Sequence, residues 1–169
     1  MKIGIISDTH GHEGAWQTAF DKAFHDADMI LHAGDVLYHG PRNPLPDEYA
    51  PAEGAAMLNG LADRIVSVRG NCEAEVDQMM LQFPCMADYA WIVDGPHQLY
   101  CTHGHLREPG SLPPLPNGTT FVYGHFHVRQ NEAMDSVHLF NPGSVGLPKD
   151  GVHSAGLYLD GEFSFVDLG

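Results

Sequence analysis

Side chains that bind divalent metals recur along the chain, each time just after a short apolar run. Two aspartates, one asparagine and four histidines stand at these places, with no cysteine among them. Such oxygen and imidazole ligands suit Mn²⁺, Fe²⁺, Co²⁺, Ni²⁺ or Zn²⁺ better than Ca²⁺, and they argue against a cysteine-based structural zinc. Two ions bridged by a carboxylate would offer a bridging hydroxide as nucleophile and neutralise phosphoryl oxygens. The residues are Asp8, His10, Asp35, Asn71, His103, His125 and His127.

The apolar runs before these residues are predicted to be strands. Residues 3–7 are a short apolar run that ends in a polar cluster, and residues 29–33 are a second run that leads into Gly34-Asp35. Residues 64–69 alternate between apolar and polar side chains. In open α/β sheets, ligands bind outside the carboxyl ends of the strands. Five loops leaving five strands at one edge would bring all seven side chains together. Taken alone, Asp8 has an ordinary alternative as a helix N-cap or turn residue, Asp35 as a turn residue and Asn71 as a left-handed loop residue.

The remaining pattern predicts an α/β chain that becomes richer in strands towards its end. Residues 13–26 carry apolar side chains at helical spacing, and helices are also expected near 52–62 and 75–81. The segment 37–51 holds four prolines and is expected to be an ordered surface loop. Sheets packed together with helices outside would satisfy this order of elements. Further strands are expected at 89–93 and 98–102, which form a hairpin, and at 119–123, 137–140, 155–159 and 162–166.

Length and composition limit the classes of protein to consider. The 169 residues predict one domain over 1–169, and the net charge of −14 excludes a long nucleic acid as partner. Small phosphorylated substrates remain compatible with this charge, because bound metals reverse the field locally. Cys72, Cys85 and Cys101 are an odd number without CxxC spacing, which favours reduced thiols. With no signal-peptide core and no membrane span, a cytoplasmic location is expected.

Five blocks containing the metal-binding residues also carry a family resemblance. In their order, they resemble the signature of the calcineurin-like metallophosphoesterases. The stretches 39–43, 48–52, 75–79 and 141–144 are similar to the small bacterial YfcE-type phosphodiesterases within that superfamily. The five blocks are Asp8-Thr9-His10-Gly11, Gly34-Asp35, Gly70-Asn71-Cys72-Glu73, Thr102-His103-Gly104-His105 and Gly124-His125-Phe126-His127.

The resemblance implies a fold, a cofactor and a reaction. The fold would be a four-layer αββα sandwich of two mixed β-sheets flanked by helices. The cofactor would be two divalent ions, with Mn²⁺ expected first and Ni²⁺, Co²⁺, Fe²⁺ or Zn²⁺ as alternatives. The reaction would be hydrolysis of small phosphodiesters by a hydroxide that bridges the two ions. By the same resemblance, Asp8, His10 and His127 would hold one ion, Asn71, His103 and His125 the other, and Asp35 would bridge both.

Three further residues are candidates for contact with the substrate. Many relatives have histidine at the position of Cys72, where it protonates or stabilises the leaving oxygen. A thiol with a pKa of about 8.5 is a weaker acid than imidazolium, so activated esters should react best. Cysteine is also a common buried residue, and simple packing of Cys72 is the equal alternative. Arg42 and His105 are candidates for binding the phosphate group, beside the catalytic set Asp35, Asn71, Cys72 and His103.

Two other functions compete with the phosphodiesterase interpretation. A phosphomonoesterase would use the same metals, but its substrate carries more negative charge, and the chain has eight basic residues to neutralise it. A non-catalytic scaffold is the second alternative, because the Vps29 subunit of retromer is similar in fold and acts as an interaction module. A scaffold is free to lose metal ligands, whereas all seven are present here. Assembly of identical copies is compatible with the sequence, and no membrane partner is expected.

Overall fold

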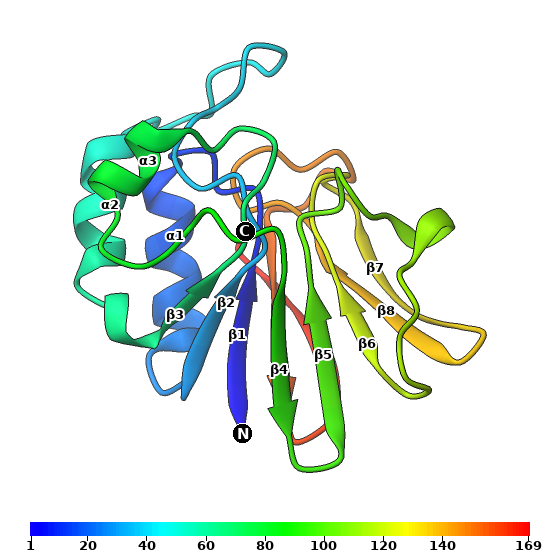
Figure 1. The fold of residues 1–169 in the computed structure, drawn as a ribbon. Coiled ribbons are helices and arrows are strands. Elements are labelled where there is room, and N and C mark those ends of the chain that lie inside the picture. Colours follow the sequence, from blue (N-terminus) through cyan, green and yellow to red (C-terminus); the bar gives the residue numbers. More distant parts are fainter.

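Two five-stranded mixed sheets lie face to face in the computed structural model, which describes residues 1–169 (Figure 1). In the first sheet, β1 is parallel to β2, and β2 to β3, whereas β9 runs antiparallel to β1. In spatial order the first sheet contains β10 (Glu162–Asp167), β9 (Ser154–Leu159), β1 (Lys2–Ile6), β2 (Met29–His32) and β3 (Ile65–Ser67).

The second sheet repeats this mixture of parallel and antiparallel pairs. Strands β5, β6 and β8 are parallel, and an antiparallel strand closes each side. The parallel strands of both sheets end at the same side of the molecule (Figure 1). In spatial order the second sheet contains β4 (Ala90–Asp94), β5 (His97–Cys101), β6 (Thr120–Val122), β8 (Val137–Pro142) and β7 (Arg129–Met134).

Helices cover the outer face of the first sheet. They are α1 (Glu13–Ala19), α2 (Pro51–Asn59) and α3 (Glu75–Met80). The prediction of one α-helix over 13–26 is wrong beyond Ala19. There α1 ends, and a π-helical turn, Phe20–Phe24, follows. In this turn the His25 N–H donates to the Phe20 carbonyl, which is five residues earlier. The turn places the Phe24 ring against Gly4, where an added Cβ would lie 2.5 Å from the ring.

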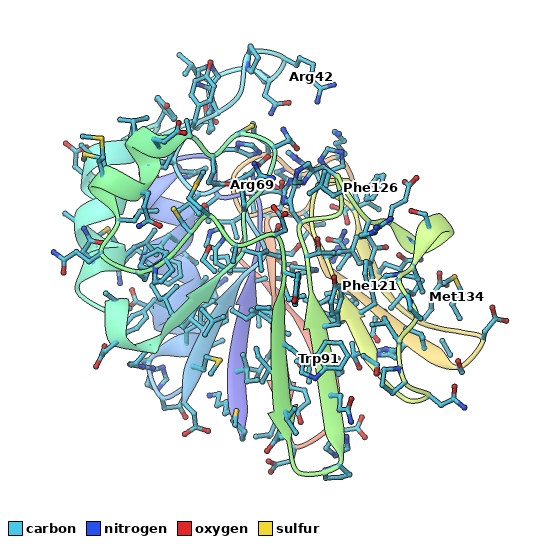
Figure 2. All side chains as sticks on the ribbon, viewed as in Figure 1. Arg42, Arg69, Trp91, Phe121, Phe126 and Met134 are labelled. Atoms are coloured by element: carbon cyan, nitrogen blue, oxygen red, sulfur yellow. The ribbon has the colours of Figure 1, made fainter.

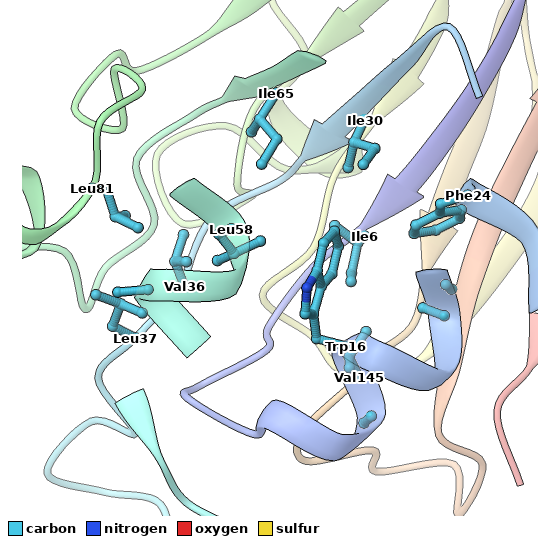
Figure 3. Close-up of a cluster of buried hydrophobic side chains, with 14 of the residues drawn as sticks. Ile6, Trp16, Phe24, Ile30, Val36, Leu37, Leu58, Ile65, Leu81 and Val145 are labelled. Carbon is cyan, nitrogen blue, oxygen red and sulfur yellow. The ribbon is translucent and has the colours of Figure 1, made fainter. Parts of the chain in front are cut away.

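Alternation along β1 divides the apolar core into two layers. Ile6 faces the helices and packs in a cluster that includes Trp16, Ile30, Leu58 and Ile65, whose side chains meet between the helices and the first sheet (Figure 3). Ile3 and Ile5 point the other way, into the layer between the two sheets. That layer also contains Leu31, Leu99, Val122, Phe140 and Tyr158, all fully buried. Because strand side chains alternate in direction, one strand fixes both layers.

The outer face of the second sheet is covered differently. Phe121, Tyr123, Val137 and Leu139 pack there against the partly buried Leu112 and Leu115. These leucines belong to the Pro- and Gly-rich segment after β5, whose helical content is one 3₁₀ turn, Pro109–Ser111. The predicted fold class is confirmed, and the fourth layer is mostly coil. No helix of the structure is long and apolar enough to cross a membrane.

Candidate metal centre

The seven predicted metal-binding residues come from five loops that leave the carboxyl ends of strands in both sheets. The loops after β1 and β2 are joined by backbone hydrogen bonds, in which Asp8 N–H donates to Gly34 and His10 N–H to Asp35. The loops after β5 and β6 are joined in the same way, with Gly124 N–H donating to His103. The predicted strand ends therefore converge. Asp8 and His10 follow β1, Asp35 follows β2, Asn71 follows β3, His103 follows β5, and His125 and His127 follow β6.

Within this convergence, imidazole nitrogens face carboxylate oxygens at short range. Asp8 Oδ1 lies 3.2 Å from His127 Nε2 and 3.7 Å from His10 Nε2. Asp35 Oδ2 lies 3.4 Å from His103 Nε2 and 3.7 Å from His10 Nε2. Asp8 Oδ1 and His10 Nε2 are buried and have no hydrogen-bond partner. Burying such groups unpaired is costly, so these two atoms fit a divalent cation as their partner.

Backbone carbonyls fix three of the histidines in one tautomer. His10 Nδ1 lies 2.8 Å from the Tyr38 carbonyl, His103 Nδ1 lies 2.7 Å from that of Ala33, and His127 Nδ1 lies 2.6 Å from that of Leu147. A carbonyl only accepts, so each Nδ1 carries the hydrogen. Nε2 is then the nitrogen that faces the two aspartates, and its lone pair is available to a metal ion once the ring is neutral. Histidines that bind metals use their second nitrogen in this way.

Left-handed backbone conformations cluster at the same residues. The φ angles of Asp8, His10, Asp35, His125 and His127 lie between 47° and 68°, although none of them is glycine. Each such residue costs on the order of 1 kcal/mol or more, and it persists only where surrounding structure enforces it. Five of the seven predicted ligands share this strain. Such a concentration of strained residues supports a functional role.

The charges at the centre depend on one another. Burial lowers the pKa of His103, but the Asp8 and Asp35 carboxylates outweigh it and raise this pKa to about 9. Burial likewise opposes the charged form of Asp8, yet His103 and His127 hold its pKa below the usual range. Without metal, protons on histidine balance the carboxylates. Metal binding must displace these protons, so metal affinity should fall as the pH falls.

The residues expected to hold the second ion are brought together less completely. Asn71 Oδ1 lies 3.2 Å from His103 Nε2, and His103 in turn faces Asp35. The rings of His125 and His103 are 5.2 Å apart between centroids, and the His125 N–H donates to Asp8 Oδ2. No hydrogen bond holds the His125 ring. The centre therefore has one fully enclosed half, around Asp8, His10 and His127, and one half that is open at Asn71.

Comparison with known proteins decides the family. A family model described as the calcineurin-like phosphoesterase superfamily domain matches residues 1–162. This chain belongs to that superfamily. The metallophosphoesterase chain is 44% identical over 152 residues to the phosphodiesterase YfcE of Escherichia coli K12, and the match covers 89% of this chain and 83% of the relative. The prediction of an enzyme that hydrolyses phosphoric esters is confirmed.

Solved structures support the same assignment. The structure of YfcE, described as a phosphoesterase from E. coli, matches the metallophosphoesterase chain with a TM-score of 0.95 and 40% identity, covering all of this chain and 94% of that one. A Vps29 from Entamoeba histolytica, solved with Zn²⁺, matches with a TM-score of 0.61 and 15% identity over the full length of both chains. At that identity the second match shows a common fold alone.

Cys72 faces the metal centre rather than the core. Its Sγ and ligand atoms of His10 and Asp35 all lie within 4.8 Å of one another. Its backbone N–H donates to Asp35 Oδ1 over 2.8 Å, and Asn71 Nδ2 lies 3.3 Å from its Sγ. Burial and the Asp35 charge raise the pKa of the Cys72 thiol well above its usual value. Of the two interpretations, position beside the reacting groups fits this geometry better than packing.

The two residues suggested for substrate binding lie at different depths. His105 stands beside the centre, with its ring centroid 5.4 Å from that of His103 and 6.3 Å from that of His125. Burial and the nearby His103 lower the pKa of His105 to about 4, so its ring is neutral at physiological pH. Arg42 is exposed near the tip of a loop that projects away from the sheets (Figure 2). Contact of either residue with substrate stays a prediction.

Glu73 supports the centre in a way that the sequence did not reveal. Its carboxylate accepts hydrogen bonds from the backbone N–H groups of Asp35, Val36 and Gly70. Burial and the Asp35 charge raise the pKa of Glu73 to about 7. It therefore ties the loop after β2 to the loop after β3. The only signal was its place in the Gly70–Glu73 block, which assigns it no role.

Glycine allows these two loops to approach. A Cβ on Gly70 would lie 2.0 Å from Asp35 Oδ1, and a Cβ on Gly34 would lie 2.7 Å from the Gly70 nitrogen. Gly34 also has a φ of 94°, which glycine adopts without strain. Below them, Asn141 Nδ2 donates to the Gly124 carbonyl, and Ser144 Oγ donates to that of Asp8. The segment 141–144 thus supports the loops that carry Asp8 and His125.

The position of Asp35 between His10 and His103 yields a direct prediction. Asp35→Asn keeps the shape of the side chain and an oxygen that can accept from the Cys72 N–H, but it removes the charge. Because both ions would depend on this carboxylate, turnover should fall more than about 10²-fold while the fold is retained. Steady-state kinetics at saturating metal and circular dichroism measure both effects. Asp63→Asn, at an exposed carboxylate without an ion-pair partner, is the matched control. Near-normal turnover of metal-saturated Asp35→Asn would contradict the assignment.

Proposed function

We propose that the chain is a phosphodiesterase that cleaves small phosphodiesters at a centre of two divalent ions. The observation that carries the proposal is the pair of unpartnered buried atoms, Asp8 Oδ1 and His10 Nε2, at the meeting point of three oriented histidines. When bound, the ions would supply an activated water as nucleophile and neutralise charge on the phosphoryl oxygens. Asp8, His10 and His127 would hold one ion, Asn71, His103 and His125 the other, with Asp35 between them.

The charge around the centre favours a diester over a monoester. A monoester has a further negative charge, which would need a free cation beside the metals. Arg69, two residues before Asn71, is paired with Asp88 at 2.7 Å, and Arg129, two residues after His127, is paired with Asp150 at 2.8 Å. Each of these two guanidinium groups is therefore already paired with a carboxylate. The 44% identical relative is also a phosphodiesterase by name.

Other features of the proposal rest on the sequence. Mn²⁺ is the expected activating ion, with Ni²⁺, Co²⁺, Fe²⁺ and Zn²⁺ as alternatives, because the ligands combine carboxylate and imidazole. The monoesterase and the scaffold remain the competing functions. A cytoplasmic location and assembly of identical copies stay predictions.

Metal removal tests the proposed function. Protein freed of metal by a chelator should be inactive towards bis(4-nitrophenyl) phosphate and should recover activity with Mn²⁺. The same protein should act more weakly on 4-nitrophenyl phosphate, because Arg69 and Arg129 are already paired with carboxylates. The measurement is kcat/KM for both esters, with bound metal counted by elemental analysis. Hydrolysis after verified metal removal would reject the metal-dependent mechanism, and a preference for the monoester would support the first alternative.

The place of Cys72 yields a second prediction. If Cys72 lies beside the leaving oxygen, a thiol protonates that oxygen poorly, and the rate should depend steeply on the acidity of the leaving group. Cys72→His should flatten this dependence, with gains of up to ~10²–10⁴-fold for the poorest leaving groups. The test is kcat/KM across diesters of graded leaving-group pKa, for metal-saturated wild type and variant. Cys72→Ala is the control, and its kcat/KM values should differ little from those of wild type. Parallel lines for wild type and Cys72→His would assign Cys72 to packing.

A further inference from the structure

An apolar cavity adjoins the metal centre. Its volume is about 460 Å³, and eight of its ten lining residues are hydrophobic. Small-molecule sites commonly measure ~300–1,000 Å³ and are mainly apolar. The walls come from the loop after β2, from the start of α2, and from the segment between β3 and the end of α3. The lining includes Tyr38, Tyr49, Ala52, Cys72, Val76 and Met80.

Cys72 joins the cavity to the centre. The same side chain that lines the cavity has its Sγ close to ligand atoms of His10 and Asp35. Tyr38 is shared in a second way, because its ring lines the cavity and its backbone carbonyl orients His10. A phosphoryl group held at Asp35 would therefore have the cavity next to it. The cavity is therefore within reach of an ester substituent on that phosphoryl group.

The lining determines which substituent the cavity would accept. It contains no lysine or arginine, so nothing in it would bind a second phosphate or a carboxylate. Its one charged residue, Asp77, is buried, and its carboxylate accepts a hydrogen bond from the Ala74 N–H at the start of α3. Tyr38, Val76 and Met80 leave much of their apolar surface exposed. An apolar ligand would remove this surface from water, which is favourable.

We propose that this cavity binds an uncharged, apolar arm of the phosphodiester, and so selects diesters with an aromatic or bulky aliphatic group. The proposal rests on the proposed function and deepens it. It excludes substrates in which both arms are highly charged. It also explains why apolar side chains of two helices and one loop are exposed together beside a charged centre.

Direct binding tests the cavity. The probes are two singly charged phosphonate monoesters, monomethyl methylphosphonate and monomethyl naphthylmethylphosphonate, whose carbon–phosphorus bond resists hydrolysis. Calorimetry with Mn²⁺-loaded protein should give a Kd about 10- to 100-fold lower for the naphthylmethyl compound. Ala52→Trp should fill the cavity and abolish this preference. Ala56→Trp, on the exposed face of α2 outside the cavity, should keep it.

A second pair of variants tests the cavity independently, in case Ala52→Trp does not fold. Val76→Asp places a charge at the cavity, and Met79→Asp places one on the same helix outside it; both positions are exposed. Only Val76→Asp should lose the preference for the naphthylmethyl probe. Equal affinity of wild type for both probes would overturn the inference. A change of oligomeric state in Ala52→Trp and Val76→Asp, without a change in probe preference, would also overturn it and make the cavity an interface between copies.

Turnover of bis(4-nitrophenyl) phosphate separates this inference from the proposed function. Wild type that hydrolyses this diester but binds both probes equally would reject the cavity assignment alone. Metal-loaded wild type that does not hydrolyse it would reject the proposed function, and with it the substrate arm assigned to the cavity.

Discussion

Two carboxylates buried side by side are the constraint on which the site depends. Asp8 and Asp35 are almost fully buried and both face His10. Negative charges so close together must be offset by positive charge, either from protons on the surrounding histidines or from metal ions. Positive charge must be placed close to both carboxylates. The loops bring the histidines there, and backbone carbonyls orient three of the imidazoles. The sheets provide the shared edge at which the balance is possible.

The predictable part of the structure follows from short-range patterns. Residues 3–7 and 29–33 are apolar runs followed within two residues by a predicted ligand, so β1, β2 and the chemistry beyond them could be expected together. Strand β7, Arg129–Met134, was missed because it is a polar edge strand, and it owes its place to its pairing with β8. The π-helical turn also depends on a distant contact, that of Phe24 with Gly4. Neither contact is visible in local sequence.

The same limit applies to the site. The types of the seven predicted ligand residues could be read from the sequence, because metal chemistry is a property of the side chain. The orientation of His10, His103 and His127 could not, since it is fixed by the carbonyls of Tyr38, Ala33 and Leu147, and any residue supplies a carbonyl. The role of Glu73 could not be predicted for a related reason, because its carboxylate accepts hydrogen bonds from backbone N–H groups, which every residue except proline has. The apolar cavity is assembled from three separate segments, so no single stretch of sequence indicates it.

Anomalous diffraction from crystals soaked in Mn²⁺ is the most direct test of the account. Data collected at a wavelength where manganese scatters anomalously should show two peaks, ~3.5–4 Å apart, with the Asp35 carboxylate contacting both. One peak should lie against Asp8, His10 and His127, and the other against Asn71, His103 and His125. A single peak at saturating Mn²⁺, or two peaks without Asp35 between them, would contradict the binuclear centre.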